Sequence, residues 1–120
     1  MRHFLTTEDW SQDELQSLID RARDWRASPL GDAFKGKSIA LLFFNPSLRT
    51  RTSFDLGAWQ MGGRAIVLDA QGQTWPVEFA DGAVMDGGPE EHVKEAARVL
   101  SSYVDLIAIR CFPKFQDWEA

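Results

Sequence analysis

The sequence lacks most of the features that mark secreted or membrane-spanning proteins. It holds a single cysteine, Cys111, which excludes an internal disulfide and leaves no cysteine cluster for zinc. The longest apolar run covers only residues 39–44, whereas a membrane-spanning helix needs about 20 apolar residues. The N-terminus passes directly into polar residues, without the apolar stretch of a secretory signal. We therefore expect a cytoplasmic protein that has no membrane partner.

Basic residues are also scarce. Thirteen Lys and Arg stand against eighteen Asp and Glu, which gives a net charge of −5. Because nucleic-acid-binding surfaces are rich in basic residues, we expect no nucleic acid as a partner. The acidic residues between 81 and 91 lack the spacing of a calcium loop, so we expect no metal there. A small molecule or another protein chain is the expected partner.

Helical and extended patterns alternate along the 120 residues, whose composition (44% hydrophobic, 26% charged) is that of one ordinary globular domain. Ser11 and Glu14 have the spacing of a capping box, and apolar residues three and four positions apart continue this helix to about Arg26. Further helices are predicted at 48–60, where Gly62 and Gly63 supply the C-terminal stop, and at 90–103. Strands are predicted at 37–44, 64–68 and 104–109, and a long loop at 69–89.

Strands that alternate with helices favour parallel pairing through right-handed crossovers. The predicted fold class is therefore α/β, an open parallel sheet with flanking helices. The continuous apolar run at 39–44 is typical of a strand covered on both faces. Three strands form a thin sheet with two open edges, which indicates part of a larger structure. Trp10, Trp25 and Trp59 lie within or beside helical stripes, and we expect them in the core.

One segment has a pattern suited to binding an anion. Residues 44–54 read Phe-Asn-Pro-Ser-Leu-Arg-Thr-Arg-Thr-Ser-Phe and join the first predicted strand to the following helix. Ligands of open α/β sheets collect at this edge. A helix N-terminus there offers unpaired amides and about half a positive charge to an anion. Several hydroxyls and the guanidinium groups of Arg49 and Arg51 add further donors for a phosphate.

The residues of this segment leave two interpretations open. It has neither the frame of a Walker loop nor that of a dinucleotide fingerprint. It is either a phosphate site or an ordinary helix start in which Ser47 is the N-cap and both arginines are solvated. Arginines near a helix N-terminus oppose the helix dipole, which favours the first interpretation. Trp75, an isolated aromatic residue in the long loop, indicates an interface or a ligand lid.

The pattern Phe-x-x-Pro-Ser-x-Arg-Thr-Arg-x-Ser-Phe is complete at residues 43–54 and resembles the carbamoyl-phosphate motif of the aspartate and ornithine transcarbamylases. Segments 41–46, 73–79, 84–87 and 110–115 extend the resemblance to the branch of this family that uses N-acetylornithine. The resemblance implies carbamoyl transfer from carbamoyl phosphate to the δ-amine of N-acetyl-L-ornithine, giving N-acetyl-L-citrulline and phosphate on a route to arginine. It also implies a homotrimer, without a metal or cofactor.

The resemblance assigns roles to matching residues. Arg49 and Arg110 would be catalytic, because fixed cationic donors stabilise the oxyanion and the departing phosphate most strongly in the transition state. Trp75 would cap the site of a neighbouring subunit. By the resemblance, Glu90 would lie near the acyl group and repel a succinyl carboxylate, whereas the residues alone favour a first-turn acid of a helix. The implied substrate-binding residues are Ser47, Leu48, Arg49, Thr50, Arg51, Trp75, Glu90 and Arg110.

Members of this family are much longer and contain a His-Pro-Cys-Gln segment and a second domain for the amino acid, neither of which occurs in these 120 residues. We therefore expect residues 1–120 to form an incomplete N-terminal carbamoyl-phosphate-binding domain that is inactive alone. Two alternatives stay open. One is a non-catalytic phosphate-binding or interaction domain, and the other is a piece of an ornithine or N-succinylornithine transcarbamylase.

Overall fold

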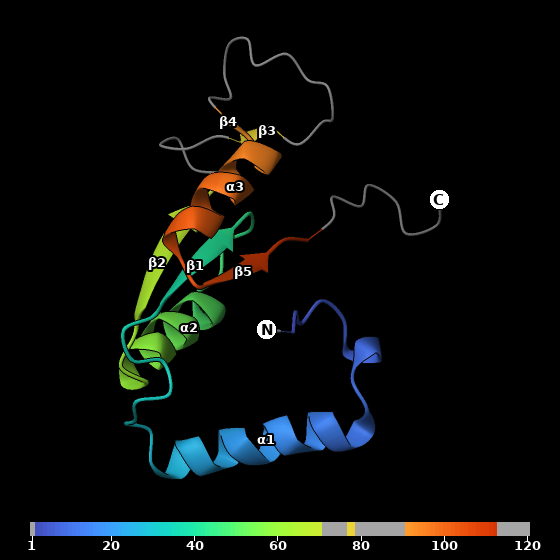
Figure 1. Ribbon diagram of the computed structural model, residues 1–120, viewed down its shortest axis with the longest axis vertical. Coiled ribbons are helices and arrows are strands. Elements are labelled where there is room, and N and C mark those ends of the chain that lie inside the picture. Colours follow the sequence, from blue (N-terminus) through green and yellow to red (C-terminus); the bar gives the residue numbers. More distant parts are fainter. Residues whose placement is uncertain (1, 71–76, 79–90, 113–120) are drawn as a thin grey trace. The chain divides into compact units, whose positions relative to one another are not determined.

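The computed structural model describes residues 2–70, 77–78 and 91–112 of the chain (Figure 1). The chain divides into two compact units, Met1–Gly31 and Asp32–Ala120. The first unit holds a short 3₁₀ helix, η1 (Thr7–Asp9), and one long helix, α1 (Gln12–Ala27). Within the described ranges, no helix combines the length and the apolar character needed to cross a membrane.

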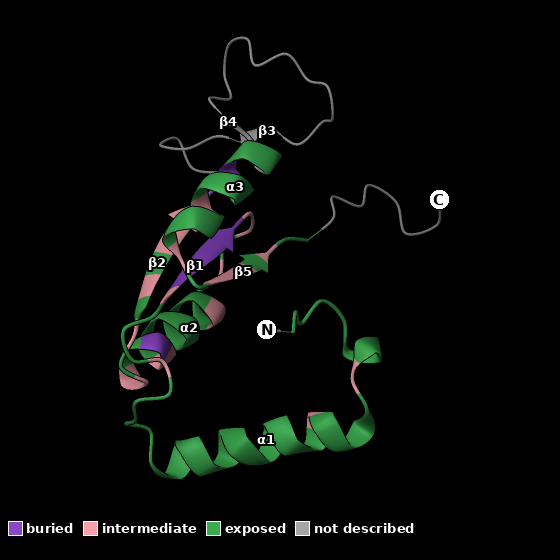
Figure 2. Cartoon of the chain, in the orientation of Figure 1, coloured by how far each residue is buried: buried purple, intermediate pink, exposed green. Residues whose placement is uncertain are grey.

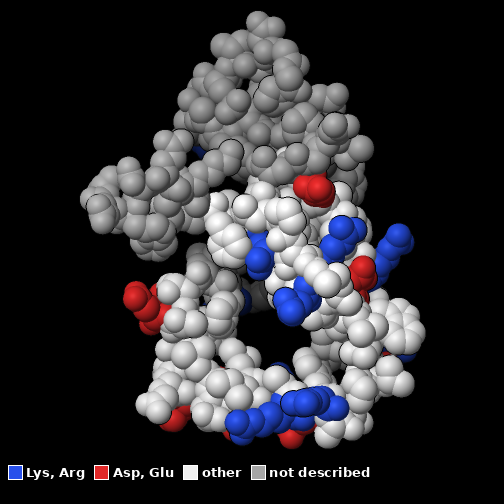
Figure 3. All heavy atoms as spheres, turned by 180° about the vertical axis from the view of Figure 1, so that it is seen from behind, with Lys and Arg blue, Asp and Glu red and all other residues white. Residues whose placement is uncertain are grey.

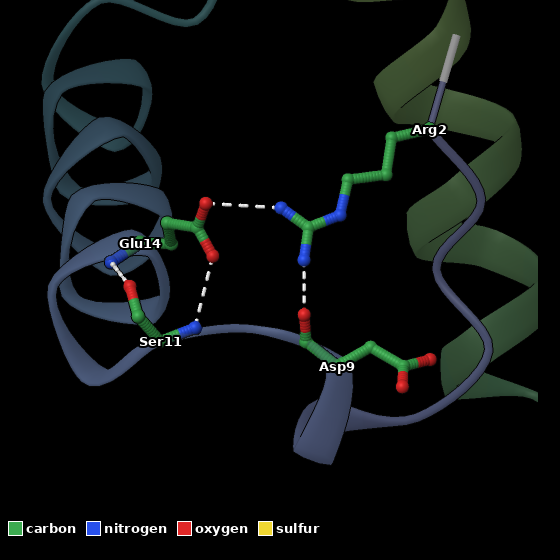
Figure 4. Close-up of polar contacts among 4 residues, drawn as sticks. All are labelled: Arg2, Asp9, Ser11 and Glu14. Atoms are coloured by element: carbon green, nitrogen blue, oxygen red, sulfur yellow. Dashed lines mark hydrogen bonds and ion pairs between the residues drawn. The ribbon is translucent and has the colours of Figure 1, made fainter.

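The capping box predicted for α1 is present. Ser11 Oγ accepts a hydrogen bond from the Glu14 amide at 3.1 Å, and Glu14 Oε2 accepts one from the Ser11 amide at 2.9 Å (Figure 4). These reciprocal bonds satisfy two amides that the start of the helix would otherwise leave unpaired. The helix ends at Ala27, one residue beyond the predicted end, so the sequence pattern is confirmed here.

Arg2 ties the N-terminal segment to the start of α1. Its guanidinium donates to Glu14 Oε1 at 2.9 Å and to the carbonyl of Asp9 (Figure 4). The same guanidinium lies 3.8 Å from the centre of the Trp10 ring, and the Phe4 ring lies on that tryptophan with 5.2 Å between the ring centres. An ion pair, a cation–π contact and an aromatic contact therefore order the residues ahead of the helix.

The prediction that Trp25 and Trp59 belong to the core is wrong, because the two side chains are 39% and 66% exposed. Trp25 lies on α1, none of whose residues is buried (Figure 2), and both basic and acidic side chains line this helix (Figure 3). Trp59 follows Ala58, the buried residue of α2 (Arg49–Gln60). Since consecutive helical residues point about 100° apart, Trp59 turns away from the face that packs.

Three parallel strands form the main sheet of the second unit. They are β1 (Ser38–Phe43), β2 (Arg64–Asp69) and β5 (Leu106–Arg110), arranged in the order β2-β1-β5. Helix α2 connects β1 to β2, and α3 (Val93–Tyr103) precedes β5 (Figure 1). This arrangement confirms the predicted α/β fold with an open parallel sheet and flanking helices.

The predictions of a loop at 69–89 and of a helix that begins at residue 90 are partly wrong. Two short strands, β3 (Val77–Glu78) and β4 (Glu91–His92), pair in parallel as a second sheet. Helix α3 begins only after β4, at Val93. Two-residue strands are too short for an alternating pattern. Acidic residues that look like a first helical turn in the sequence therefore give no warning of main-chain pairing.

Strand β1 forms the centre of the core. The odd-numbered residues of 39–43 form a buried cluster with Ala58 of α2. Ala40 and Leu42 point to the opposite face, because side chains alternate along a strand, and they are buried as well (Figure 2). The continuous apolar run thus correctly predicted a strand covered on both faces.

The glycine pair predicted to end α2 does so. Gly62 has φ of +86°, which is in the left-handed region that favours glycine. Gly63 is required by space, because a Cβ there would lie 2.7 Å from the carbonyl oxygen of Phe34 and 2.8 Å from that of Lys37. Both are backbone atoms of the segment that leads into β1, so the two chain segments meet without room for a side chain.

We expect Gly63→Ala to lower the free energy of unfolding by about 1–3 kcal/mol, as overpacking of a tight contact does. Gly57→Ala is the matched control, because a Cβ at this position in α2 meets nothing within 4 Å. This control should be neutral or stabilising by about 0.5–1 kcal/mol. Urea denaturation of both variants measures the difference, and equal effects would contradict the packing assigned to Gly63.

A second prediction concerns acid stability. The hydrogen bond from the Ser11 amide, with support from Arg2, lowers the pKa of Glu14 below its ordinary value. Such a carboxylate stabilises the fold fully above its unfolded pKa, and this contribution is lost as the pH falls through the folded pKa. Glu14→Gln should therefore destabilise the chain near neutral pH and have no effect in strong acid. Urea denaturation across pH tests this, with Asp13→Asn, outside the capping box, as the control.

Candidate anion-binding site

The site lies at the edge of the main sheet where β1, β2 and β5 end side by side. In the sheet register, Phe43 of β1 lies opposite Asp69 of β2 on one side and Arg110 of β5 on the other. The Ala70 amide donates to the Phe43 carbonyl at 3.0 Å, and the Phe44 amide donates to the Arg110 carbonyl at 2.9 Å. The pairing therefore continues to the carboxyl edge of the sheet, where open α/β folds bind ligands.

The N-terminus of α2 lies at this edge, directly after β1. Ser47 Oγ accepts a hydrogen bond from the Thr50 amide at 3.2 Å, which is the capping contact expected from the ordinary helix-start interpretation. The first bond from one turn to the next is that of the Thr52 amide to the Leu48 carbonyl, at 3.0 Å. The amides of Leu48, Arg49 and Arg51 precede this bond and have no hydrogen-bond acceptor within the described ranges, so they are suited to an anion.

Arg110 reaches this helix start from β5. Its Nη1 donates to Thr50 Oγ1 at 3.2 Å, across 60 residues of sequence. Its guanidinium carbon lies 4.6 Å from the centre of the Phe112 ring. Its Nε is buried and has no hydrogen-bond partner among the described residues. Because a buried donor without an acceptor is unfavourable, this nitrogen marks a place where an anionic ligand would supply one.

The two arginines of the helix start are exposed and form no ion pair within the described part of the chain. Arg51 lines a pocket of about 450 Å³ together with Ser47, Leu48 and Asp69. The first turn of α2 contains no acidic residue. The positive end of the helix dipole and both guanidinium groups therefore act together, which weakens the helix start and strengthens its attraction for anions.

The structure brings most of the predicted site residues together. Ser47, Leu48 and Arg51 line the larger pocket, and Thr50 and Arg110 line a smaller hollow of about 50 Å³. Arg49 is the first residue of α2 and lines neither. The predicted residues Trp75 and Glu90 lie outside the described residues, and their roles stay predictions.

Sequence reasoning missed two residues of this edge. Asn45 and Asp69 both line the larger pocket. Asp69 is the last residue of β2 and follows its apolar residues, and this position was a signal that it belongs to the ligand edge. Asn45 lies inside the motif at residues 43–54, but nothing in the motif shows that its side chain bonds to the segment after β5.

These features define the class of protein. The family model described as aspartate/ornithine carbamoyltransferase, carbamoyl-P binding domain, matches residues 2–120. The chain belongs to the aspartate/ornithine carbamoyltransferases and forms their carbamoyl-phosphate-binding domain.

The names of relatives within the family specify the amino-acid substrate of each enzyme. The chain is 58% identical, over 98% of its length, to the N-acetylornithine carbamoyltransferase of Xanthomonas campestris pv. campestris. It is 40% identical, over 71% of its length, to the N-succinylornithine carbamoyltransferase of Bacteroides fragilis. In each case it spans about a third or less of the relative's length, 35% and 27% respectively.

A solved structure agrees with these relatives. It is an N-acetyl-L-ornithine transcarbamylase in which one glutamate is replaced by proline, complexed with carbamyl phosphate and N-succinyl-L-norvaline. It superposes with a TM-score of 0.90 at 57% identity, over 99% of this chain and 36% of that one. The fold of the chain is therefore that of the N-terminal part of such enzymes.

The contact between Thr50 and Arg110 leads to a third prediction. Thr50→Val removes the hydroxyl that accepts from Arg110 and keeps the shape of the side chain. We expect the affinity of the chain for inorganic phosphate to fall about tenfold, since hydrogen bonds to charged groups contribute about 1.5–3 kcal/mol. Thr52→Val, an exposed position one half-turn on, is the matched control and should bind as the parent does. Isothermal titration measures both, and equal affinities in the two variants would contradict the role of Thr50.

Proposed function

We propose that the protein containing this chain transfers the carbamoyl group of carbamoyl phosphate to the δ-amine of N-acetyl-L-ornithine, giving N-acetyl-L-citrulline and phosphate. The chain contributes the carbamoyl-phosphate half of this site and is inactive alone, because an amine-binding part must position the nucleophile. The reaction is a step of arginine biosynthesis in the cytoplasm and needs no cofactor.

The observation that carries this proposal is the convergence of Arg110 and Thr50 on the N-terminus of α2. Arg110 bonds to the helix start through Nη1 while its buried Nε has no acceptor among the described residues. The first-turn amides of α2 add further donors beside these side chains. The difference in identity, 58% to an N-acetylornithine enzyme against 40% to an N-succinylornithine enzyme, supports the acetylated substrate.

The chemistry requires this distribution of charge. Attack of the δ-nitrogen on the carbamoyl carbon places negative charge on the carbonyl oxygen. The bond from this carbon to the phosphate oxygen then breaks, phosphate leaves with the bonding electrons, and the nitrogen loses a proton. Arg110 and Arg49 are proposed to stabilise the oxyanion and the leaving phosphate, because such interactions strengthen in the transition state. The backbone amides of Leu48, Arg49 and the capped turn hold the phosphate itself.

The active form is proposed to be a homotrimer. In this arrangement Trp75 of one subunit caps the carbamoyl-phosphate site of its neighbour and excludes water from it. The support is a resemblance at residues 73–79 together with the position of this tryptophan in a polar, glycine-rich segment.

Glu90 is proposed to select the acyl group. A carboxylate beside the acyl pocket accepts an acetyl group but repels the extra carboxylate of a succinyl group, by about 4 kcal/mol at 4 Å before screening. The solved relative that holds N-succinyl-L-norvaline is a variant that lacks one glutamate, which supports a glutamate in this role. We assign Glu90 as the corresponding residue.

The full-length protein should form citrulline product from N-acetylornithine far faster than from ornithine or N-succinylornithine. In Glu90→Ala, kcat/KM for N-succinylornithine should rise at least about tenfold relative to that for N-acetylornithine, because the repulsion is removed. Glu91→Ala is the matched control and should discriminate as the parent does. A colorimetric citrulline assay measures these ratios. Preference for ornithine in the parent would contradict the proposed substrate, and unchanged discrimination in Glu90→Ala would contradict its role alone.

A further inference from the structure

Asn45 joins the two segments from which the site is built. Its Oδ1 accepts a hydrogen bond from the Phe112 amide at 2.7 Å, across 67 residues of sequence. It is the only asparagine of the chain, and it lies between the end of β1 and the cap of α2. One side chain of the anion-binding loop therefore fixes the backbone that follows β5.

This bond acts directly behind Arg110. The Phe44 amide donates to the Arg110 carbonyl at 2.9 Å, so the backbone on both sides of residue 111 is held by adjacent residues of the loop after β1. The Phe112 ring lies 4.6 Å from the Arg110 guanidinium carbon. Asn45 holds the Phe112 backbone, and the position of the Phe112 ring follows from that backbone. Asn45 therefore determines where the ring lies against the Arg110 guanidinium.

The residue type suits this task. Asn45 precedes Pro46, and a residue before proline is restricted to extended backbone conformations. This restriction limits the direction in which the Asn45 side chain leaves the backbone. Its amide supplies an acceptor oxygen without a net charge. An aspartate would accept the same bond but would place a negative charge at the edge where the anion binds.

We propose that Asn45 is a positioning residue of the carbamoyl-phosphate site, which holds Phe112 and, through its ring, the guanidinium of Arg110. Arg110 has three supports in this arrangement: the backbone bond from Phe44, the Thr50 hydroxyl and the Phe112 ring. The identity of the anion rests on the proposed function, whereas the support of Arg110 does not.

The experiment follows the Arg110 Nε–H signal, the hydrogen exchange of the amide at position 112 and the affinity for carbamoyl phosphate, all by NMR on the isotope-labelled chain. In Asn45→Ala we expect the amide at position 112 to exchange at least about tenfold faster, because its acceptor is gone. The Arg110 Nε–H signal should move to the position that it has in Phe112→Leu, where the ring is absent. Affinity for carbamoyl phosphate should fall about tenfold.

Asp105→Ala is the matched control. Asp105 Oδ2 accepts from the Ser38 amide at 2.9 Å, also across 67 residues, at the opposite end of the same pair of strands. Its removal should lower stability and leave the Arg110 signal and the affinity unchanged. An unmoved Arg110 signal in Asn45→Ala, or an equal loss of affinity in Asp105→Ala, would overturn the proposal.

Two further outcomes are decisive. If Asn45→Ala does not fold, Asn45→Asp replaces it. This variant keeps the acceptor and should keep both the protection at position 112 and the Arg110 signal, while it weakens anion binding through its charge. A loss of both signals there overturns the positioning role. If the parent chain does not bind carbamoyl phosphate, the proposed function fails in this chain, and the Arg110 signal still decides whether Asn45 positions it.

Discussion

Parallel pairing of β1 with strands on both of its sides places every described part of the site. The register sets Phe43 level with Asp69 and Arg110, and main-chain bonds continue one residue past the strand on each side. The loop after β1 then turns into α2 at the same edge. Because residues so far apart in sequence meet only through this pairing, a loss of register by one residue would separate Arg110 from Thr50 and reverse the faces of the strand.

Several residues of the site lower the stability of helix α2, at whose N-terminus they lie. Helix α2 starts with two arginines, no acid in its first turn and an exposed Leu48, all of which a helix selected for stability alone would avoid. Ser47 offsets part of this disadvantage as a cap. The buried Nε of Arg110, which has no acceptor within the described residues, is a second unfavourable element at the same place. With the proposed anion bound, both would become favourable, so the proposed binding couples to local stability.

The sequence predicted elements whose signals are local. The capping box of Ser11, the apolar run at 39–44 and the glycines after Gln60 each determine their structure through neighbouring residues, and each is confirmed. Strands β3 and β4 were missed because two residues carry no periodicity. The exposure of Trp59 was missed because a helix with a short buried face, here Ala58, leaves adjacent large residues outside.

The residues of the site likewise divide into those that a local pattern predicts and those that depend on long-range contacts. The motif at residues 43–54 predicted the helix start from local pattern alone, and Ser47 as its cap was one of two open interpretations. The contacts of Arg110 with Thr50 and of Asn45 with Phe112 join residues 60 and 67 positions apart, and no local pattern encodes them. Trp75 and Glu90 remain predictions that rest on resemblance.

The most direct test of the account is a titration of the isotope-labelled chain with carbamoyl phosphate, followed through its amide and arginine Nε–H signals. The account predicts saturating shifts at residues 48–50 and at Arg110 Nε–H, with no shift at Gly57 within the same helix. Shifts centred on the arginines of α1, which are Arg21, Arg23 and Arg26, would contradict it. So would shifts that grow without saturation, because they would show screening of surface charge instead of a site.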